Sequence, residues 1–252
     1  MNGADQNGSY YVSLRTEIYP FRNIDGYISG SPVHGLGRTN DNAILFTALY
    51  FITLKLRNED TYEDALEVKR LVTNITHNGV LLRYPGDFEV DDSFDNYVAY
   101  AALCVHYKLR WLMFKTVLRM SLCLGFLNAS GKFTRNAFIF RFLALSLCAF
   151  PAAMGLPSPF NAVLGYVIGN SNKGESTDAV DNRKNLWLLI QAMKNSYFCR
   201  RGAERWITRM NSDYAIRAAA IGTTPFRAML LAYFLNSEYP PVKYGVPTQE
   251  KK

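Results

Sequence analysis

Acidic side chains are concentrated in one short stretch, Asp87-Phe-Glu-Val-Asp-Asp-Ser-Phe-Asp-Asn-Tyr97, which leads into an apolar run. Glycoside hydrolysis needs two carboxyl groups about 5–9.5 Å apart, with one of them kept protonated. Asp92 and Asp95 are one helical turn apart and could form such a pair. Asp41 would approach them if the helix starts share one face, and Tyr27, Phe94 and Tyr97 would then line the cleft.

The same acidic stretch has a purely structural interpretation. Asp92 and Asp95 are spaced like an N-cap and N3 pair, and an acidic side chain is favourable at the positive end of a helix. Calcium ligation is the third reading, since Asp87, Glu89 and Asp91 alternate like loop ligands. However, no glycine and no closing glutamate complete a calcium loop. The sequence therefore predicts no metal and leaves helix capping and glycan chemistry as the alternatives.

Histidine is the usual general base near neutral pH, and this chain has His34, His77 and His106. His34 lies in the glycine-rich loop Ser31-Pro-Val-His-Gly-Leu-Gly-Arg38 and is the best candidate for that role. The alternative is that His34 is an ordinary loop histidine that is hydrogen-bonded to the backbone. His106 lies in an apolar helical stretch, which is typical of a hydrogen-bonded core group. No phosphate-binding loop, dinucleotide fingerprint or Ser-His-Asp pattern is present, so no cofactor is predicted.

The charge of the chain is divided unevenly along its 252 residues. Residues 1–100 carry a net charge of −6 and residues 101–252 a net charge of +13, which together give the overall +7. An apolar fraction of 49% and a charged fraction of 19% are typical of an ordered globular protein. The division of charge predicts either internal complementarity or head-to-tail contact between copies. The basic residues are scattered without a binding motif, which does not favour nucleic acid as a partner.

Membrane insertion is not predicted. The longest uncharged apolar stretch, 142–156, is shorter than the roughly 20 residues that a spanning helix requires, and Pro151 interrupts it. The polar start at residues 1–9 predicts no signal peptide and therefore synthesis in the cytoplasm. The cysteines lie in apolar or helical stretches without a C-x-x-C pair, which is typical of buried reduced thiols: Cys104, Cys123, Cys148 and Cys199.

The apolar pattern predicts an all-α fold made of antiparallel helical hairpins. Residues 1–39 have no helical period and are expected to form an extended aromatic N-terminal arm. A single helical domain is expected over 40–240, and a tail over 241–252. The helix from about 40 to 57 is apolar nearly all round, and the next one, beginning at Asp60-Thr61, is amphipathic. We read this as an alternation of inner and outer helices. A short strand is expected at Val80–Tyr84, and further helices at 110–124, 133–150, 158–168, 182–196, 200–211 and 225–236.

Two motifs carry a family resemblance. The segments Arg38-Thr-Asn-Asp-Asn-Ala-Ile-Leu-Phe-Thr-Ala-Leu-Tyr50 and Asp91-Asp-Ser-Phe-Asp-Asn-Tyr-Val-Ala-Tyr-Ala-Ala-Leu103 resemble a group of phage-encoded all-helical proteins. That group is itself similar to (α/α) toroids, the architecture of several carbohydrate-active enzymes. The resemblance covers residues 15–107 and implies a partial toroid-like array of hairpins. Phe94 stands where the group often has histidine, which weakens the transfer of a catalytic role.

These observations lead to one functional expectation and one alternative. We expect a structural component of a bacteriophage virion that binds other virion proteins or copies of itself through the arm and through complementary charged surfaces. The expected interface residues are Tyr19, Phe21, Tyr27, Arg38, Asn96 and Tyr97. The alternative is a glycan-binding or glycan-cleaving toroid enzyme, of the glycoside hydrolase or lyase type, that uses Asp92, Asp95, Asp41 and His34.

Overall fold

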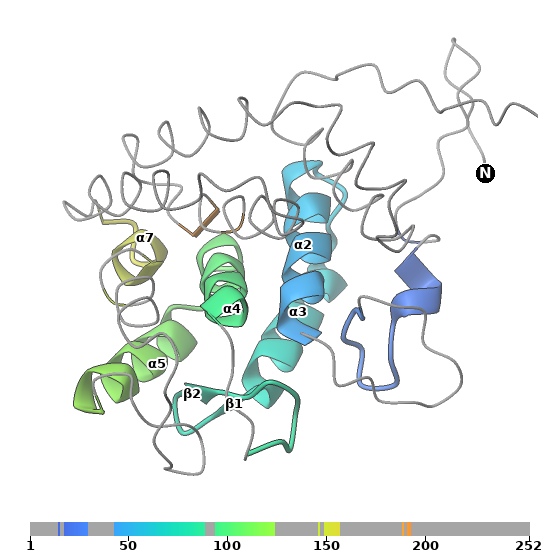
Figure 1. The fold of residues 1–252 in the computed structure, drawn as a ribbon. Helices are drawn as coiled ribbons and strands as arrows, with labels where there is room; N and C mark the ends of the chain where they lie inside the picture. Colours follow the sequence, from blue (N-terminus) through green and yellow to red (C-terminus); the bar gives the residue numbers. More distant parts are fainter. Residues whose placement is uncertain are drawn as a thin grey trace, which may run out of the picture.

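A computed structural model describes residues 15, 18–29, 43–88, 94–123, 146, 149–156, 188 and 191–192. Within these residues the chain is mainly helical with one two-stranded sheet, as the sequence predicts for the fold class. The elements are a 3-10 turn η1 (Tyr19–Phe21), helices α2 (Ala43–Leu56), α3 (Tyr62–Asn74), α4 (Phe94–His106), α5 (Arg110–Leu122) and α7 (Phe150–Ala153), and strands β1 (Thr76–His77) and β2 (Val80–Leu81). Figure 1 shows their arrangement.

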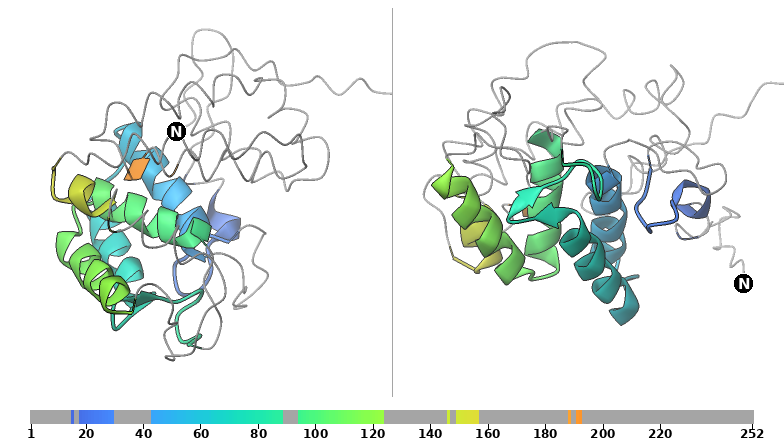
Figure 2. Two further views of the ribbon diagram at one scale, coloured as in Figure 1. Left: turned by 60° about the vertical axis from the view of Figure 1, so that its left-hand side comes forward. Right: turned by 90° about the horizontal axis from the view of Figure 1, so that it is seen from below.

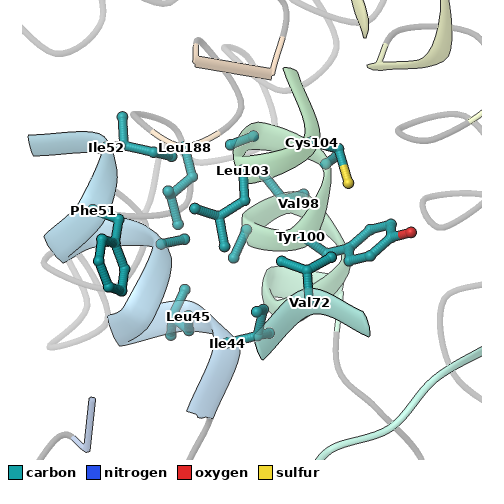
Figure 3. Close-up of a cluster of buried hydrophobic side chains, with 14 of the residues drawn as sticks. Ile44, Leu45, Phe51, Ile52, Val72, Val98, Tyr100, Leu103, Cys104 and Leu188 are labelled. Atoms are coloured by element: carbon teal, nitrogen blue, oxygen red, sulfur yellow. The ribbon is translucent and has the colours of Figure 1, made fainter. Parts of the chain in front are cut away.

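Helices α2 and α4 form the centre of the described part. Every residue of α2 from Ala43 to Leu54 is buried, as are the α4 residues from Asn96 to His106. A helix that is apolar nearly all round must be covered on all sides, and these two helices cover one another over much of their length. Figure 3 shows Ile44, Leu45 and Ile52 of α2 facing Val98 and Leu103 of α4.

Helices α3 and α5 lie on the outside. In α3 only Asp64, Val68, Leu71 and Val72 are buried, and in α5 only Met113, Thr116 and Met120. Short connections join α2 to α3 and α4 to α5, and such connections make sequential helices antiparallel neighbours. The described part therefore consists of two hairpins, each with one inner and one outer helix. The expected alternation of an inner and an outer helix is confirmed for α2 and α3, and α4 and α5 show the same arrangement.

The helix ends follow from local chemistry. Thr61 caps α3 by accepting from the Asp64 amide, while the Asp64 carboxylate accepts from the Thr61 amide, which forms a capping box. Beyond α2, Asn58 has φ +56°, and the Glu59 amide donates to the Leu54 carbonyl at 2.9 Å. Lys108 takes φ +56° beyond α4. Left-handed residues of this kind end helices by satisfying their last carbonyl groups.

A β-hairpin links the two helical hairpins. Asn78 and Gly79, both with positive φ, form the two-residue turn between β1 and β2. Strand β1 contacts α3 and strand β2 contacts α5 (Figure 2). The strand predicted over Val80–Tyr84 begins where expected but ends at Leu81, and its partner β1 was not predicted.

Some predicted helices lie only partly inside the described residues. The helix expected at 110–124 is α5. Of the helix expected at 133–150, only residues 146, 149 and 150 are described, and all three are helical. Helix α7 begins at Phe150 and runs to Ala153, beyond the predicted limit. Leu188, Gln191 and Ala192 are helical, in agreement with the helix expected at 182–196. The remaining predicted helices and the tail at 241–252 lie outside the described residues.

Candidate functional site

The acidic stretch enters the described structure only at its two ends. Asp87 is half-buried, and its amide donates to the Tyr84 carbonyl at 3.0 Å. Asp95 is the second residue of α4, although its side chain lies outside the description. Asp92, Asp41 and His34 lie outside it altogether, so the predicted catalytic arrangement stays a prediction. Within the described residues, no group of three His, Cys, Asp or Glu side chains is placed to hold a metal ion.

The aromatic residues predicted to meet a ligand or partner have different surroundings. Tyr19 is 79% exposed and Phe21 packs half-buried against the core, whereas Tyr27 and Tyr97 are each 1% exposed. Asn96 is fully buried as well. Tyr27, Asn96 and Tyr97 are therefore core residues in this structure and offer no open surface to a partner. Arg38 lies outside the described residues.

Residues 18–29 are built into the helical body and do not extend from it. Ile18, Tyr27 and Ile28 belong to the same core cluster as α2 and α4. The Tyr27 hydroxyl donates to the Leu71 carbonyl of α3 at 2.7 Å, and the Ile28 amide donates to Thr47 Oγ1 of α2 at 3.0 Å. Over this range the predicted extended arm is corrected to a packed segment. The rest of the predicted arm, apart from Arg15, is outside the described residues.

Polar groups fix the shape of this segment. The Asn23 carboxamide accepts from the Tyr27 amide at 2.9 Å and donates to the Tyr84 hydroxyl at 3.2 Å. Tyr84 in turn donates to the Asp25 carboxylate. Burial raises the pKa of Tyr27 well above its ordinary value, so the phenol stays protonated and remains a donor at physiological pH. This network, which is buried except at the half-buried Asp25, holds the turn in place.

Ion pairs join the N-terminal segment to α3. Arg15 bonds both carboxylate oxygens of Asp64, at 3.0 and 2.6 Å, and Arg22 pairs with Glu67. Burial alone would raise the pKa of Asp64, but the hydrogen bonds from Arg15 and Thr61 outweigh it and leave that pKa below its ordinary 3.8. Asp64 therefore serves at once as the N3 residue of the capping box and as the anchor for Arg15.

The histidines and cysteines of the described part differ in burial. His106 is 5% exposed and bonds Gln191, which confirms its predicted place as a hydrogen-bonded core group. His77 is exposed at the hairpin, next to the ring of Phe88. Cys104 is buried, and burial raises the pKa of its thiol to about 12; Cys123 is half-buried. Cys148 and Cys199 lie outside the described residues.

A row of exposed apolar side chains lies on α5, where no site was predicted. Trp111 is 64% exposed, Phe114 40%, Leu118 47% and Leu122 74%. These residues, called the α5 stripe below, recur at spacings of three and four and so share one face of the helix. Contiguous exposed apolar surface on a folded protein marks an interaction site more often than chance. In the sequence, this surface could have been found from the spacing of these four residues and from the basic residues among them.

Comparison with known proteins adds no relative to this description. No family model matches the chain, and no match was found among curated proteins or solved structures. Among the described residues, no helix has the length and apolar character that crossing a bilayer requires.

Proposed function

We propose that this protein is a structural component of a bacteriophage virion and that it works by assembly. The observation that carries the proposal is a difference in burial: the inner helices are covered, whereas the outer helices expose apolar side chains. Helices α2 and α4 are buried, while Trp111 and Leu122 on α5 and Tyr62 on α3 are each more than half exposed. Contiguous exposed apolar side chains, such as those of α5, mark interaction surfaces in soluble proteins. The phage context comes from the resemblance of the segments 38–50 and 91–103.

The arm contributes to this proposal at its exposed end. Tyr19 and Ile24 are 79% and 60% exposed, although the segment that carries them is anchored by Tyr27. An anchored segment presents its exposed side chains in a fixed geometry, which lowers the entropy lost on binding. We assign contact with neighbouring virion proteins to Tyr19 and to the part of the predicted arm outside the described residues.

Mass spectrometry of purified particles tests the proposal. Particles produced by a phage genome that encodes this chain are separated on a density gradient, and the particle band is compared with the soluble lysate. We expect the chain in the particle band at a fixed ratio to the major capsid protein, and defective particles when its gene is deleted. Recovery of the chain from the soluble lysate alone would contradict the proposal.

The alternative, a glycan-acting toroid, is favoured by one observation. Helices α2 and α4 lie side by side, and their colours in Figure 1 show that both begin at the same end. Inner helices with this common direction are what a toroid-like array of hairpins requires, and their starts are where Asp41 and Asp95 stand in the sequence. Replacing Asp95 by Asn should then abolish sugar binding or turnover while the melting temperature hardly changes. A large loss of stability without any sugar ligand would favour the capping role.

A further inference from the structure

Helix α5 lies at an edge of the described helices and has two different faces (Figure 1). Met113 and Met120 are buried against the core, and the α5 stripe of Trp111, Phe114, Leu118 and Leu122 faces away from it. Side chains that are 64% and 74% exposed, as Trp111 and Leu122 are, project from the surface and do not line a groove. At 1.5 Å per residue the stripe is about 17 Å long. It is therefore a raised apolar ridge.

Basic side chains border this ridge on both sides. At about 100° per residue, Lys115 and Arg119 come next to one edge of the α5 stripe, and Arg110 lies toward the other. Arg110 and Lys115 are exposed, as is Lys108 just before the helix, while Arg119 is half-buried. The ammonium group of Lys115 lies 5.3 Å from the centroid of the Trp111 ring. Cations and apolar groups therefore form one continuous surface.

No acidic side chain balances these charges on the helix. Arg110–Leu122 contains neither Asp nor Glu, and the same is true of β2 and α7, which pack against α5. Among the described residues, Lys108, Arg110 and Lys115 make no ion pair. Charge complementarity therefore requires a partner that is anionic where it meets the border and apolar where it meets the ridge.

The other outer helix lacks this separation of charge. On α3, Tyr62 and Leu66 are 74% and 51% exposed, so the apolar exposure is comparable to that of α5. However, the exposed side chains beside them are of both signs, with Glu63 on one side and Lys69 and Arg70 on the other. A surface of mixed charge does not favour an anionic partner, which makes α3 the matched control for α5.

Helix α5 is also held in place before any partner binds. Gly79, in the tight turn of the β-hairpin, lies so close to α5 that an added Cβ would be 2.7 Å from the Lys115 carbonyl oxygen. On the side of α7, the rings of Phe114 and Phe150 are 6.2 Å apart. A surface fixed in this way is preorganised, so little conformational entropy is lost on binding.

We propose that α5 lies on the surface of an anionic lipid bilayer. The α5 stripe enters the boundary between headgroups and acyl chains, and the basic border meets the lipid phosphate and carboxylate groups. Interfacial helices have this composition, with Trp, Phe and Leu on one face and Lys and Arg beside them, and they lie in the plane of the bilayer without spanning it. Trp is enriched at this depth because its ring is amphipathic. The inference goes beyond the assembly role, whose protein contacts remain with Tyr19 and Tyr62.

Flotation of the purified chain with vesicles tests this surface. We expect binding to mixed vesicles of phosphatidylcholine and phosphatidylserine. Binding to phosphatidylcholine alone should be at least about tenfold weaker, because each Lys or Arg near an anionic surface contributes about fivefold. Added salt should weaken binding to the mixed vesicles by screening these charges. A chain that binds neither kind of vesicle, or both equally well, would overturn the proposal.

A charge reversal locates the contact. Lys115→Glu places a carboxylate beside Trp111 and should weaken binding to the mixed vesicles about tenfold or more. Lys69→Glu makes the same change at an exposed position of α3 and should weaken binding less than about twofold, since that residue stays away from the lipid. Equal weakening by the two variants would overturn the proposal, because binding would then follow the net charge of the whole chain.

The apolar ridge needs its own pair of variants. Trp111→Ser/Leu122→Ser should leave the melting temperature nearly unchanged and remove vesicle binding. Tyr62→Ser/Leu66→Ser removes one aromatic and one leucine side chain of comparable exposure from α3 and should bind vesicles like the wild type. Undiminished binding by the α5 variant, or equal loss in both variants, would contradict insertion of the α5 stripe.

A protein surface is the competing occupant of the α5 stripe. Sedimentation without lipid separates the two: self-association that Trp111→Ser/Leu122→Ser removes and Tyr62→Ser/Leu66→Ser retains would mean that a second copy covers the stripe, and would overturn the lipid contact. Failure here is distinct from failure of the proposed function. A chain found in particles that binds no vesicle loses only the lipid contact, and a vesicle-binding chain absent from particles loses only the virion role.

Discussion

The ring of His106, in the last turn of α4, donates from Nε2 to Oε1 of Gln191 at 2.8 Å, across 85 positions of sequence. Both side chains are buried, at 5% and 2% exposure. Leu188, one turn before Gln191, lies against α2 and α4 in the same core (Figure 3). A short piece of the C-terminal half therefore packs into the core formed by the N-terminal helices.

The bond between His106 and Gln191 should couple the two halves of the chain energetically. We expect His106→Leu to lower the free energy of unfolding by about 1–3 kcal/mol, because a buried hydrogen-bonding side chain loses its partner. A double-mutant cycle with Gln191→Leu should give a coupling energy of about 1 kcal/mol. Denaturant unfolding measures both, and His77→Leu at the exposed hairpin is the control. Strictly additive effects would mean that the bond contributes nothing.

Replacing two threonines of α2 by valine should change the stability of the fold in opposite directions. Thr47 donates to the Ala43 carbonyl at 2.6 Å and accepts from the Ile28 amide, whereas the buried Thr53 hydroxyl has no hydrogen-bond partner among the described residues. Thr47→Val should destabilise by about 1–3 kcal/mol because it leaves a buried amide unpaired. Thr53→Val should stabilise by about 1 kcal/mol because it removes an unpaired buried hydroxyl. Equal effects in thermal unfolding would contradict this reading.

Asp64 should make the free energy of unfolding depend on pH in the acidic range. The pKa of Asp64 is lowered in the folded chain, so the unfolded chain takes up a proton first as pH falls. The stabilising effect is therefore fully present above the ordinary pKa of 3.8 and is lost as pH falls through the lower folded pKa. Asp64→Asn should cost about 1–3 kcal/mol near neutral pH, and the difference from the wild type should shrink as pH falls below about 4. Asp60→Asn, which breaks only the surface pair with Lys55, should cost about 0–1 kcal/mol. A pH-independent Asp64→Asn difference would refute the assignment.

Cys104 should resist alkylation in the folded protein. Its thiol is fully buried with a pKa near 12, so almost no thiolate exists to react at pH 8. Peptide mapping after iodoacetamide treatment should find Cys104 unmodified in native protein and modified after unfolding. The half-buried Cys123, next to Leu122 of the α5 stripe, should react faster. Rapid native labelling of Cys104 would mean that the core opens far more often than its packing implies.

Several elements could be predicted because local chemistry decides them. The all-round apolar pattern of Ala43–Leu54 fixes α2 as a buried helix, and Thr61 with Asp64 marks the start of α3 before any packing is known. The Asn78-Gly79 pair also carries a local signal, since this dipeptide favours the tight turn of a hairpin. This dipeptide could have indicated the hairpin and therefore β1. The alternation of side chains could not, because each strand has only two residues.

Other features depend on contacts that the sequence does not display. Tyr19 and Tyr27 stand in the same aromatic segment, yet one is exposed and the other is buried, because the turn at Gly26 presses that part of the chain against α3. Helix α5 is apolar on both faces, so periodicity alone did not show whether Met113 or Trp111 would face the core. The acidic stretch before α4 and His34 remain predictions, since their arrangement depends on residues outside the described part.

Two substitutions within residues 18–29 should separate an effect on stability from an effect on assembly. Tyr27→Ala removes a buried ring and its bond to the Leu71 carbonyl, so it should destabilise by about 3–5 kcal/mol. Tyr19→Ala changes an exposed side chain and should shift stability by no more than about 0.5 kcal/mol, while it weakens incorporation into particles if Tyr19 contacts a neighbouring virion protein. Chemical denaturation and particle mass spectrometry measure the two effects independently. Normal incorporation of Tyr19→Ala would remove this residue from the interface, and a negligible effect of Tyr27→Ala would mean that residues 18–29 are not part of the core.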